Sequence, residues 1–132
     1  MREILFRGKD FVFGNWVEGF YFTAKTDQGT VVAIDSGDEV CQVIPETVGQ
    51  YTGVTDKNGK KIFENDILSS HPDELSTDDE IQLIVVWHDY GWFGKDSKDK
   101  FISLESKWVN ELFEVVGNQF DNPELMVGEA HG

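Results

Sequence analysis

The chain has 132 residues, too few for more than one domain or two small subdomains, and enough to fold without a metal or a disulfide. Its formal net charge of −14 disfavours direct nucleic-acid binding, because neutralising phosphates requires a basic face. The acid is concentrated in the second half, where four cations stand against fourteen anions. The best basic cluster (Lys57, Lys60 and Lys61) falls on an expected turn.

A single cysteine, Cys41, excludes an intrachain disulfide and is compatible with a reducing compartment. The first ten residues carry no signal-peptide pattern, and no stretch approaches the roughly 18 apolar residues of a membrane span. We therefore expect a soluble, cytoplasmic protein.

The first third of the chain predicts short antiparallel strands. Aromatic residues alternate along 16–22, as expected for a half-buried strand, and β-branched runs follow at 31–34 and 40–44. Gly- and Asp-rich turns separate the three segments. We expect a β meander over residues 1–45, which could serve as an oligomerisation subdomain.

The middle of the chain continues in the same style. Pro45 predicts one helical turn over 45–48, and Asn58-Gly59 predicts a tight hairpin. Residues 72–80 read as an acidic loop, and the nearly continuous apolar run 81–87 is typical of a strand covered on both faces or of one in a small barrel.

The last third predicts one short helix within further strands. An apolar stripe through Leu104, Trp108 and Leu112 indicates a helix over 103–112 with Ser103 as its cap. A strand over 113–116 should end at Gly117, a helical turn should open at Asn122, and residues 127–132 read as a tail. The fold class is thus mainly β, an α+β protein with one or two short helices.

Several segments resemble the YopX family, proteins of phages and prophages of Gram-positive bacteria. They are the opening MREI (1–4) with FRG (6–8), the stretches VIPETVGQYTG (43–53) and DKNGKKIFENDI (56–67), and the closing EVVGN (114–118) with DNPEL (121–125). Gln119 stands where the family pattern has an aliphatic residue. Asn65 stands where the family pattern has Gly, and Asn also tolerates a positive φ. The resemblance implies a β-rich fold, an SH3-like barrel over 46–126 and a tendency to self-assemble, but no known activity.

No constellation of residues predicts a metal, a cofactor or a nucleophile. His71, Asp73, His88 and Asp89 lack zinc-site spacing, and Asp56-x-Asn58 lacks the later ligands of a calcium loop. Cys41 lies in an expected strand among apolar neighbours, where a thiol is inert. We therefore expect a protein without catalytic activity.

The tryptophans point to recognition instead. Trp87, Tyr90, Trp92 and Phe93 lie close together in sequence, and any that are exposed would form an aromatic patch suited to subunit contact. The competing interpretation places all four tryptophans in the core.

The leading functional hypothesis is a non-enzymatic, homo-oligomeric interaction module. One alternative is an acidic nucleic-acid mimic, in which the 72–80 loop helps to occupy the basic groove of a host protein. Another is a small hydrolase or ligand-binding protein with its site at a subunit junction. Direct DNA binding would need Lys57, Lys60 and Lys61 on one surface with aromatic residues.

Overall fold

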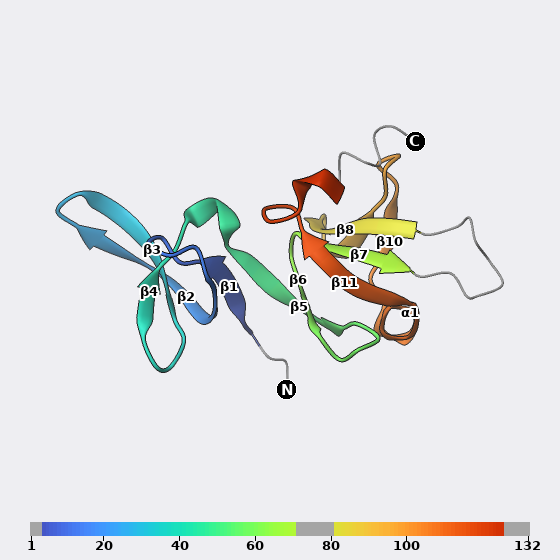
Figure 1. Ribbon diagram of the computed structural model, residues 1–132, viewed down its shortest axis with the longest axis horizontal. Coiled ribbons are helices and arrows are strands. Elements are labelled where there is room, and N and C mark those ends of the chain that lie inside the picture. The colour runs from blue at the N-terminus through green and yellow to red at the C-terminus, as the bar shows by residue number, and fades with distance from the viewer. Residues whose placement is uncertain (1–3, 71–80, 126–132) are drawn as a thin grey trace. The chain divides into compact units, whose positions relative to one another are not determined.

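A computed structural model describes residues 4–70 and 81–125, so His71, Asp73, the 72–80 loop and the 127–132 tail lie outside the described residues. The chain divides into two compact units, residues 1–51 (unit 1) and 52–132 (unit 2). The described strands are all antiparallel and form sheets of six and five strands, so the mainly β prediction is confirmed (Figure 1). Among the described residues, no helix has the length and apolar character needed to cross a bilayer.

Unit 1 is an antiparallel meander followed by a return strand. The chain runs through β1 (Phe6–Lys9), β2 (Trp16–Thr26), β3 (Gly29–Asp35), β4 (Val40–Gln42), the 3-10 turn η1 (Pro45–Thr47) and β5 (Gly49–Thr55). The spatial order β4-β3-β2-β1-β5 shows that each consecutive strand pairs with the one before it until β5 returns to β1. The predicted turn at Pro45 is confirmed.

One face of the unit 1 sheet forms its small core. Ile34 and Val43 are fully buried there. Gly8 lies between them, so that a Cβ at this position would lie 3.1 Å from Val43 Cβ. The aromatic rings of Phe6 and Tyr21 pack on the same face at 5.4 Å between centroids.

On the opposite face of this sheet, β2 is more exposed than the predicted half-buried strand. Trp16, Phe20 and Phe22 do share one face, but its cover is uneven. Trp16 is half-buried, with the Arg7 guanidinium 4.5 Å from the centroid of its ring, whereas Phe20 is 70% exposed. Their cross-strand neighbours offer little cover, because Phe20 lies opposite Asp35 and Phe22 opposite Ala33. The period-two alternation identifies the faces of a strand but not which of them the rest of the chain covers.

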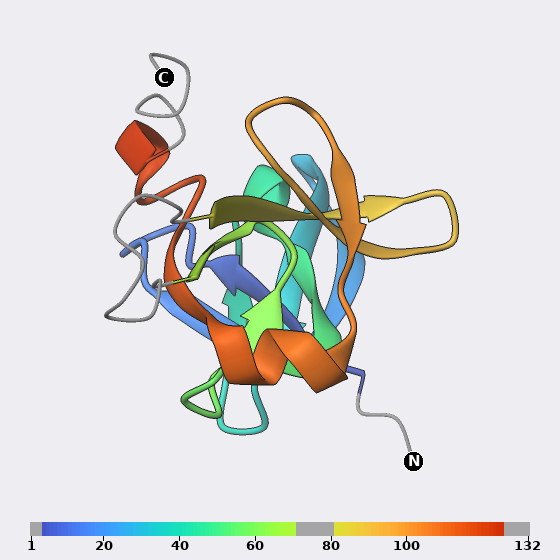
Figure 2. The same cartoon turned by 90° about the vertical axis from the view of Figure 1, so that its right-hand side faces the viewer.

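Unit 2 contains the end of β5, then β6 (Lys61–Phe63), β7 (Asp66–Ser70), β8 (Ile81–His88), β9 (Gly91–Lys95), β10 (Phe101–Ser103), α1 (Ser106–Leu112) and β11 (Phe113–Asn118). Its five-stranded sheet has the order β10-β9-β8-β7-β11. Figure 2 shows α1 leading from β10 into β11. The core of this unit comprises Ile62, Leu68, Leu83, Val85, Leu104, Val109 and Phe113.

The closed barrel predicted for unit 2 is not found among the described strands. β10 and β11 are the two ends of the open five-stranded sheet. β10 has three residues and pairs only with β9 before the chain turns into α1. The run 81–87 is covered on both faces only over Leu83, Ile84 and Val85, whereas Trp87 is 52% exposed.

Local boundaries differ from the predictions in two places. The helix begins at Ser106, with Glu105 as its N-cap. Ser103 does not cap it, because Ser103 belongs to β10 and pairs with Phe93 of β9. Gly117 does not end β11, which continues to Asn118 through an irregularity between Val115 and Gly117. Residues 123–125 open a helical turn, as the Asn122-Pro123 pair predicts.

Candidate interaction surfaces

The β8–β9 hairpin positions all four residues of the predicted aromatic patch. Register pairs Trp87 with Trp92 and Val86 with Phe93. Because side chains alternate along a strand, the two tryptophans share one face and Phe93 lies on the other. Tyr90 occupies the turn between the strands and is 96% exposed. The structure therefore divides the predicted patch between two faces and a turn.

Trp87 and Trp92 form an edge-to-face pair at the rim of the unit 2 core. Their ring centroids are 5.0 Å apart with an interplanar angle of 74°. Trp92 packs against the core cluster, while half of Trp87 stays in water. The indole N–H of Trp92 is buried without a hydrogen-bond partner among the described residues. Trp92 is thus an anchor of the fold, and Trp87 is the member of the pair that can meet a partner.

A second aromatic cluster, which the sequence did not predict, covers the opposite face. His88 stacks on Phe101 with ring centroids 4.0 Å apart and planes within 7°. Phe93 contacts both rings edge-on, at 5.8 Å from His88 and 6.1 Å from Phe101. Phe101 comes from β10, and nothing local in the sequence indicated that β10 would bring it next to His88.

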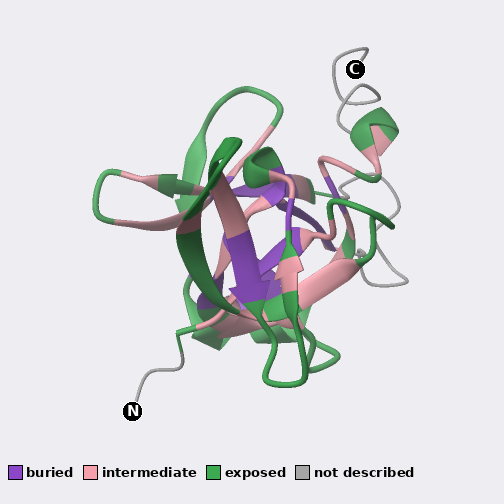
Figure 3. Ribbon diagram, turned by 90° about the vertical axis from the view of Figure 1, so that its left-hand side faces the viewer, coloured by how far each residue is buried: buried purple, intermediate pink, exposed green. Residues whose placement is uncertain are grey.

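Unit 1 presents the larger exposed apolar surface. Eight large hydrophobic residues of this unit are exposed, whereas four hydrophobic residues are buried. Figure 3, coloured by burial, shows exposed residues on the hairpins and buried ones in the middle of the sheet. The exposed set is Ile4, Phe11, Val12, Phe13, Phe20, Tyr21, Phe22 and Val40. These residues, without Tyr21, which lies on the core face beside Phe6, are called the unit 1 apolar surface below.

A rigid turn holds three members of this surface. The Asp10 carboxylate Oδ1 accepts hydrogen bonds from the backbone N–H groups of Val12, at 2.7 Å, and Phe13, at 3.2 Å. The N–H of Gly14 donates to the carbonyl of Asp10. The turn therefore presents Phe11, Val12 and Phe13 to solvent in a fixed geometry.

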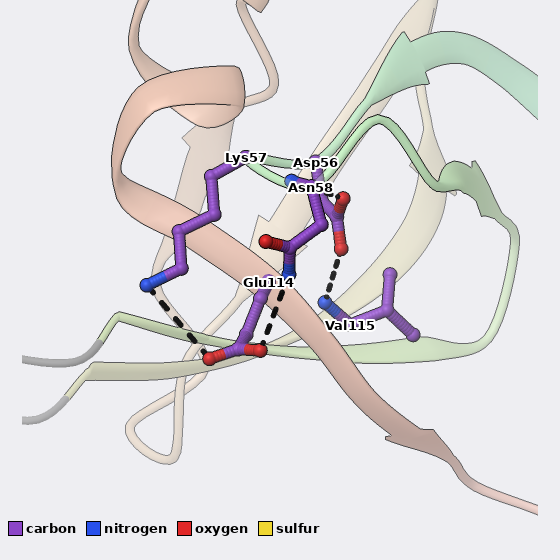
Figure 4. A network of polar contacts seen from close by, with 5 residues as sticks. All are labelled: Asp56, Lys57, Asn58, Glu114 and Val115. Atoms are coloured by element: carbon purple, nitrogen blue, oxygen red, sulfur yellow. Dashed lines mark hydrogen bonds and ion pairs between the residues drawn. The ribbon is translucent and has the colours of Figure 1, made fainter.

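The 56–60 hairpin is a structural clamp rather than a calcium loop. Asp56, which is 3% exposed, accepts through Oδ1 from the N–H groups of Asn58 and Lys60 at 2.8 and 2.9 Å. Its Oδ2 accepts from the N–H of Val115 in β11 at 2.9 Å (Figure 4). The carboxylate thus points at backbone donors on both sides, which leaves it poorly placed for a cation.

Lys57 extends the same clamp. Its Nζ lies 3.8 Å from Glu114 Oε1, and Asn58 Nδ2 donates to Glu114 Oε2 at 3.4 Å (Figure 4). The lysine is therefore partly neutralised by a carboxylate of β11. This pairing weakens the reading of Lys57, Lys60 and Lys61 as a nucleic-acid surface.

The described residues contain no group of three or more His, Cys, Asp or Glu side chains arranged to hold a metal ion. His88 is stacked on Phe101, and its Nε2 lies 3.4 Å from Asp89 Oδ2. Cys41, in β4, is partly buried. Desolvation, and then the carboxylates of Glu39 and Asp10, raise the pKa of its thiol. A raised pKa keeps the sulfur protonated at neutral pH, the opposite of what a nucleophile needs.

We expect Cys41 to react slowly with iodoacetamide. Between pH 7 and 9 its rate constant should lie below that of glutathione measured alongside, since less of the thiol is ionised. Replacing the nearby carboxylate in Glu39→Gln should raise the rate. A rate at or above that of glutathione at pH 7 would show an activated thiol and contradict this expectation.

Comparison with known proteins agrees with the β-rich architecture. Residues 5–127 match the model of the YopX protein family. The crystal structure of protein EF1440 from Enterococcus faecalis is similar, with a TM-score of 0.59 and 22% identity over 96% of this chain and 99% of that one. At this identity the likeness shows a shared fold alone. No curated protein matches the chain. Since the family match covers nearly the whole sequence, the chain belongs to the YopX family.

Proposed function

We propose that the protein is a non-enzymatic interaction module that assembles with copies of itself through the unit 1 apolar surface. The observation that carries this proposal is the imbalance in unit 1, where eight large hydrophobic residues are exposed and four hydrophobic residues are buried among the described residues. Monomeric soluble proteins rarely expose large contiguous apolar patches. A unit with so small a core gains stability by covering this surface.

The size of the surface suits a stable interface. A standard interface buries about 800 Å² on each partner. A fully covered aromatic side chain contributes about 150–250 Å². Four aromatic residues belong to the unit 1 apolar surface, and two of them, Phe20 and Phe22, share one face of β2. With the exposed aliphatic members of that surface, their exposed area approaches the order that a dimer needs.

A second copy is the occupant that fits the chemistry of this face. Phe20, Asp35 and Val40 lie in one row across β2, β3 and β4, and Phe22, Ala33 and Gln42 lie in the next row. Asp35 is the one charged residue in these two rows. In a twofold dimer the rows of the two copies can therefore face each other with little repulsion between like charges. The self-assembly that the family resemblance implies points to the same occupant.

We propose further that unit 2 has an SH3-like topology. Its support is topological: β7 to β10 form a meander, α1 follows, and β11 returns to pair with β7. Small barrels and open barrel-like sheets of this type present loops and edge strands to partners. We place the module in the bacterial cytoplasm, on the strength of the phage and prophage resemblance.

Sedimentation velocity over a wide concentration range tests the proposal. The native chain should sediment as a multiple of 15.0 kDa, and Phe20→Glu should sediment as a 15.0-kDa monomer. The exposed position of Phe20 makes the variant compatible with folding, which circular dichroism checks. Leu112→Glu is the matched control, because it adds the same charge to an exposed apolar residue of unit 2 and should leave the mass unchanged. A native monomer at every concentration would refute the proposal.

A further inference from the structure

We propose that the open edge of β10 binds an extended peptide segment that carries apolar and acidic residues, as an added strand of the unit 2 sheet. This surface is separate from the unit 1 apolar surface and does not depend on self-assembly. Strand addition at a sheet edge uses main-chain hydrogen bonds for affinity and side-chain contacts for selectivity. Three features of β10 favour such binding: its backbone edge, the aromatic side chains along it and the positive charge beside it.

The backbone of β10 offers a free edge among the described strands. The Leu104 N–H donates to the Trp92 carbonyl, and the Asp96 N–H donates to the Lys100 carbonyl. With the two-residue period of an antiparallel ladder, Ile102 opposite Gly94 belongs to the same hydrogen-bonded set. The main-chain groups of Phe101 and Ser103 therefore point away from β9. Two residues in this orientation supply two donors and two acceptors to an incoming strand.

The side chains along this edge form an aromatic floor. Phe101 is 42% exposed, and its ring is held by the stack on His88 and the edge-on contact with Phe93. The ring thus needs no rearrangement to receive an apolar side chain of an added strand. Ile102 and Ser103 are also exposed, so all three residues of β10 are accessible to solvent.

The charge beside the edge selects the partner. Residues 95–100, which join β9 to β10, carry three lysines against two aspartates in a chain of net charge −14. Asp99 pairs with Lys95 at 3.6 Å. The Asp96 carboxylate accepts the N–H groups of Lys98 and Lys100. Lys98 and Lys100 thus bring positive charge to an otherwise acidic protein, which favours carboxylates on a strand laid along β10.

Fluorescence anisotropy with a labelled decapeptide of alternating valine and glutamate tests the inference. Ser103→Pro removes an N–H that points away from β9, and an edge strand tolerates proline at such a position. The substitution should weaken peptide binding at least about tenfold. Ser103→Ala, the matched control, keeps the N–H and should bind like the native chain. Lys98→Glu with Lys100→Glu should weaken binding most strongly at low salt.

Two further probes keep the test independent of any protein variant. The same peptide with N-methyl groups along one edge keeps its side chains but cannot pair, and it should bind at least about tenfold more weakly. An alternating valine–lysine peptide should also bind weakly. The inference would be overturned if either probe bound as tightly as the unmodified valine–glutamate peptide. It would also be overturned if that peptide did not bind the native chain, or bound Ser103→Pro with unchanged affinity.

Sedimentation of Ser103→Pro without peptide separates this inference from self-assembly. Its mass should equal that of the native chain. A drop in mass would show that a second copy occupies the β10 edge, which overturns the peptide proposal. Loss of assembly in Phe20→Glu with peptide binding retained would support both proposals and show that they are independent. A native chain that is monomeric at every concentration but binds the peptide would refute self-assembly alone.

Discussion

Replacing Asp56 with alanine should lower the free energy of unfolding of unit 2 by about 3 kcal/mol, because three backbone N–H groups lose their acceptor at once. Two of these donors, Asn58 and Lys60, lie in the hairpin, and the third belongs to Val115 in β11. The backbone N–H of Lys57 donates to the Phe113 carbonyl beside them, so the side chain and the main chain together fasten the 56–60 hairpin to β11. Chemical denaturation followed by tryptophan fluorescence measures the loss.

The chain contains its own control for this prediction. The 96–100 hairpin repeats the pattern: Asp96 Oδ1 accepts from the N–H groups of Lys98 and Lys100 at 2.8 and 2.9 Å. In both loops the aspartate N–H also donates to the carbonyl four residues on, Lys60 in one and Lys100 in the other. Asp96 is only partly buried and has no counterpart to the Val115 contact among the described hydrogen bonds.

Asp96→Ala should therefore cost far less stability than Asp56→Ala. Asp56→Asn should fall between them, because its amide oxygen can still serve the hairpin while its NH₂ faces the N–H of Val115. Equal losses for Asp56→Ala and Asp96→Ala would show that the hairpin turn, and not the link to β11, carries the stabilisation.

These two hairpins show how far local sequence signals reach. Asn58-Gly59 correctly predicts a turn, yet of these two only Gly59 has a positive φ, at 82°. A two-residue type I′ turn would need both. The aspartate at the start of the loop decides the geometry instead, and Asp99 takes the corresponding position at 62° in the second hairpin. Asn65, at 76°, adopts the positive φ that its place in the family pattern implies.

What the sequence could not predict depends on contacts between distant segments. Asp56 and Val115 are 59 residues apart, and no periodicity links them. Trp87 and Phe93 both belong to an aromatic run, but the turn at Asp89 and Tyr90 sends them to opposite faces. The exposed face of β2 has the same alternation that a buried face would have, because coverage is a property of the whole fold. Local turns, strands and the short helix were therefore accessible, and the surfaces were not.

Replacing Gly19 with alanine should destabilise unit 1 by about 2–3 kcal/mol or more, since the added Cβ has no space. It would lie 2.7 Å from the carbonyl carbon of Asp35 and 2.9 Å from Ser36 Cα. Both are backbone atoms, so no side-chain rotation relieves the clash, and β2 must move relative to β3. Gly91→Ala is the matched control, because its Cβ would meet only Phe93 Cε1 at 3.6 Å, and it should change stability by about 0.5 kcal/mol at most.

Hydrogen exchange resolves where the damage falls. Each unit has its own core, so Gly19→Ala should accelerate exchange in β2 and β3 and leave the β7–β8 region of unit 2 protected. Equal acceleration in both units would contradict this expectation. The same two measurements distinguish damage to the fold from damage to the contact between copies. Gly19→Ala should lose both self-assembly and the protection of the β2 amides from exchange. Phe20→Glu should lose self-assembly with that protection intact, because an exposed ring contributes to contact between copies and little to the unit that carries it.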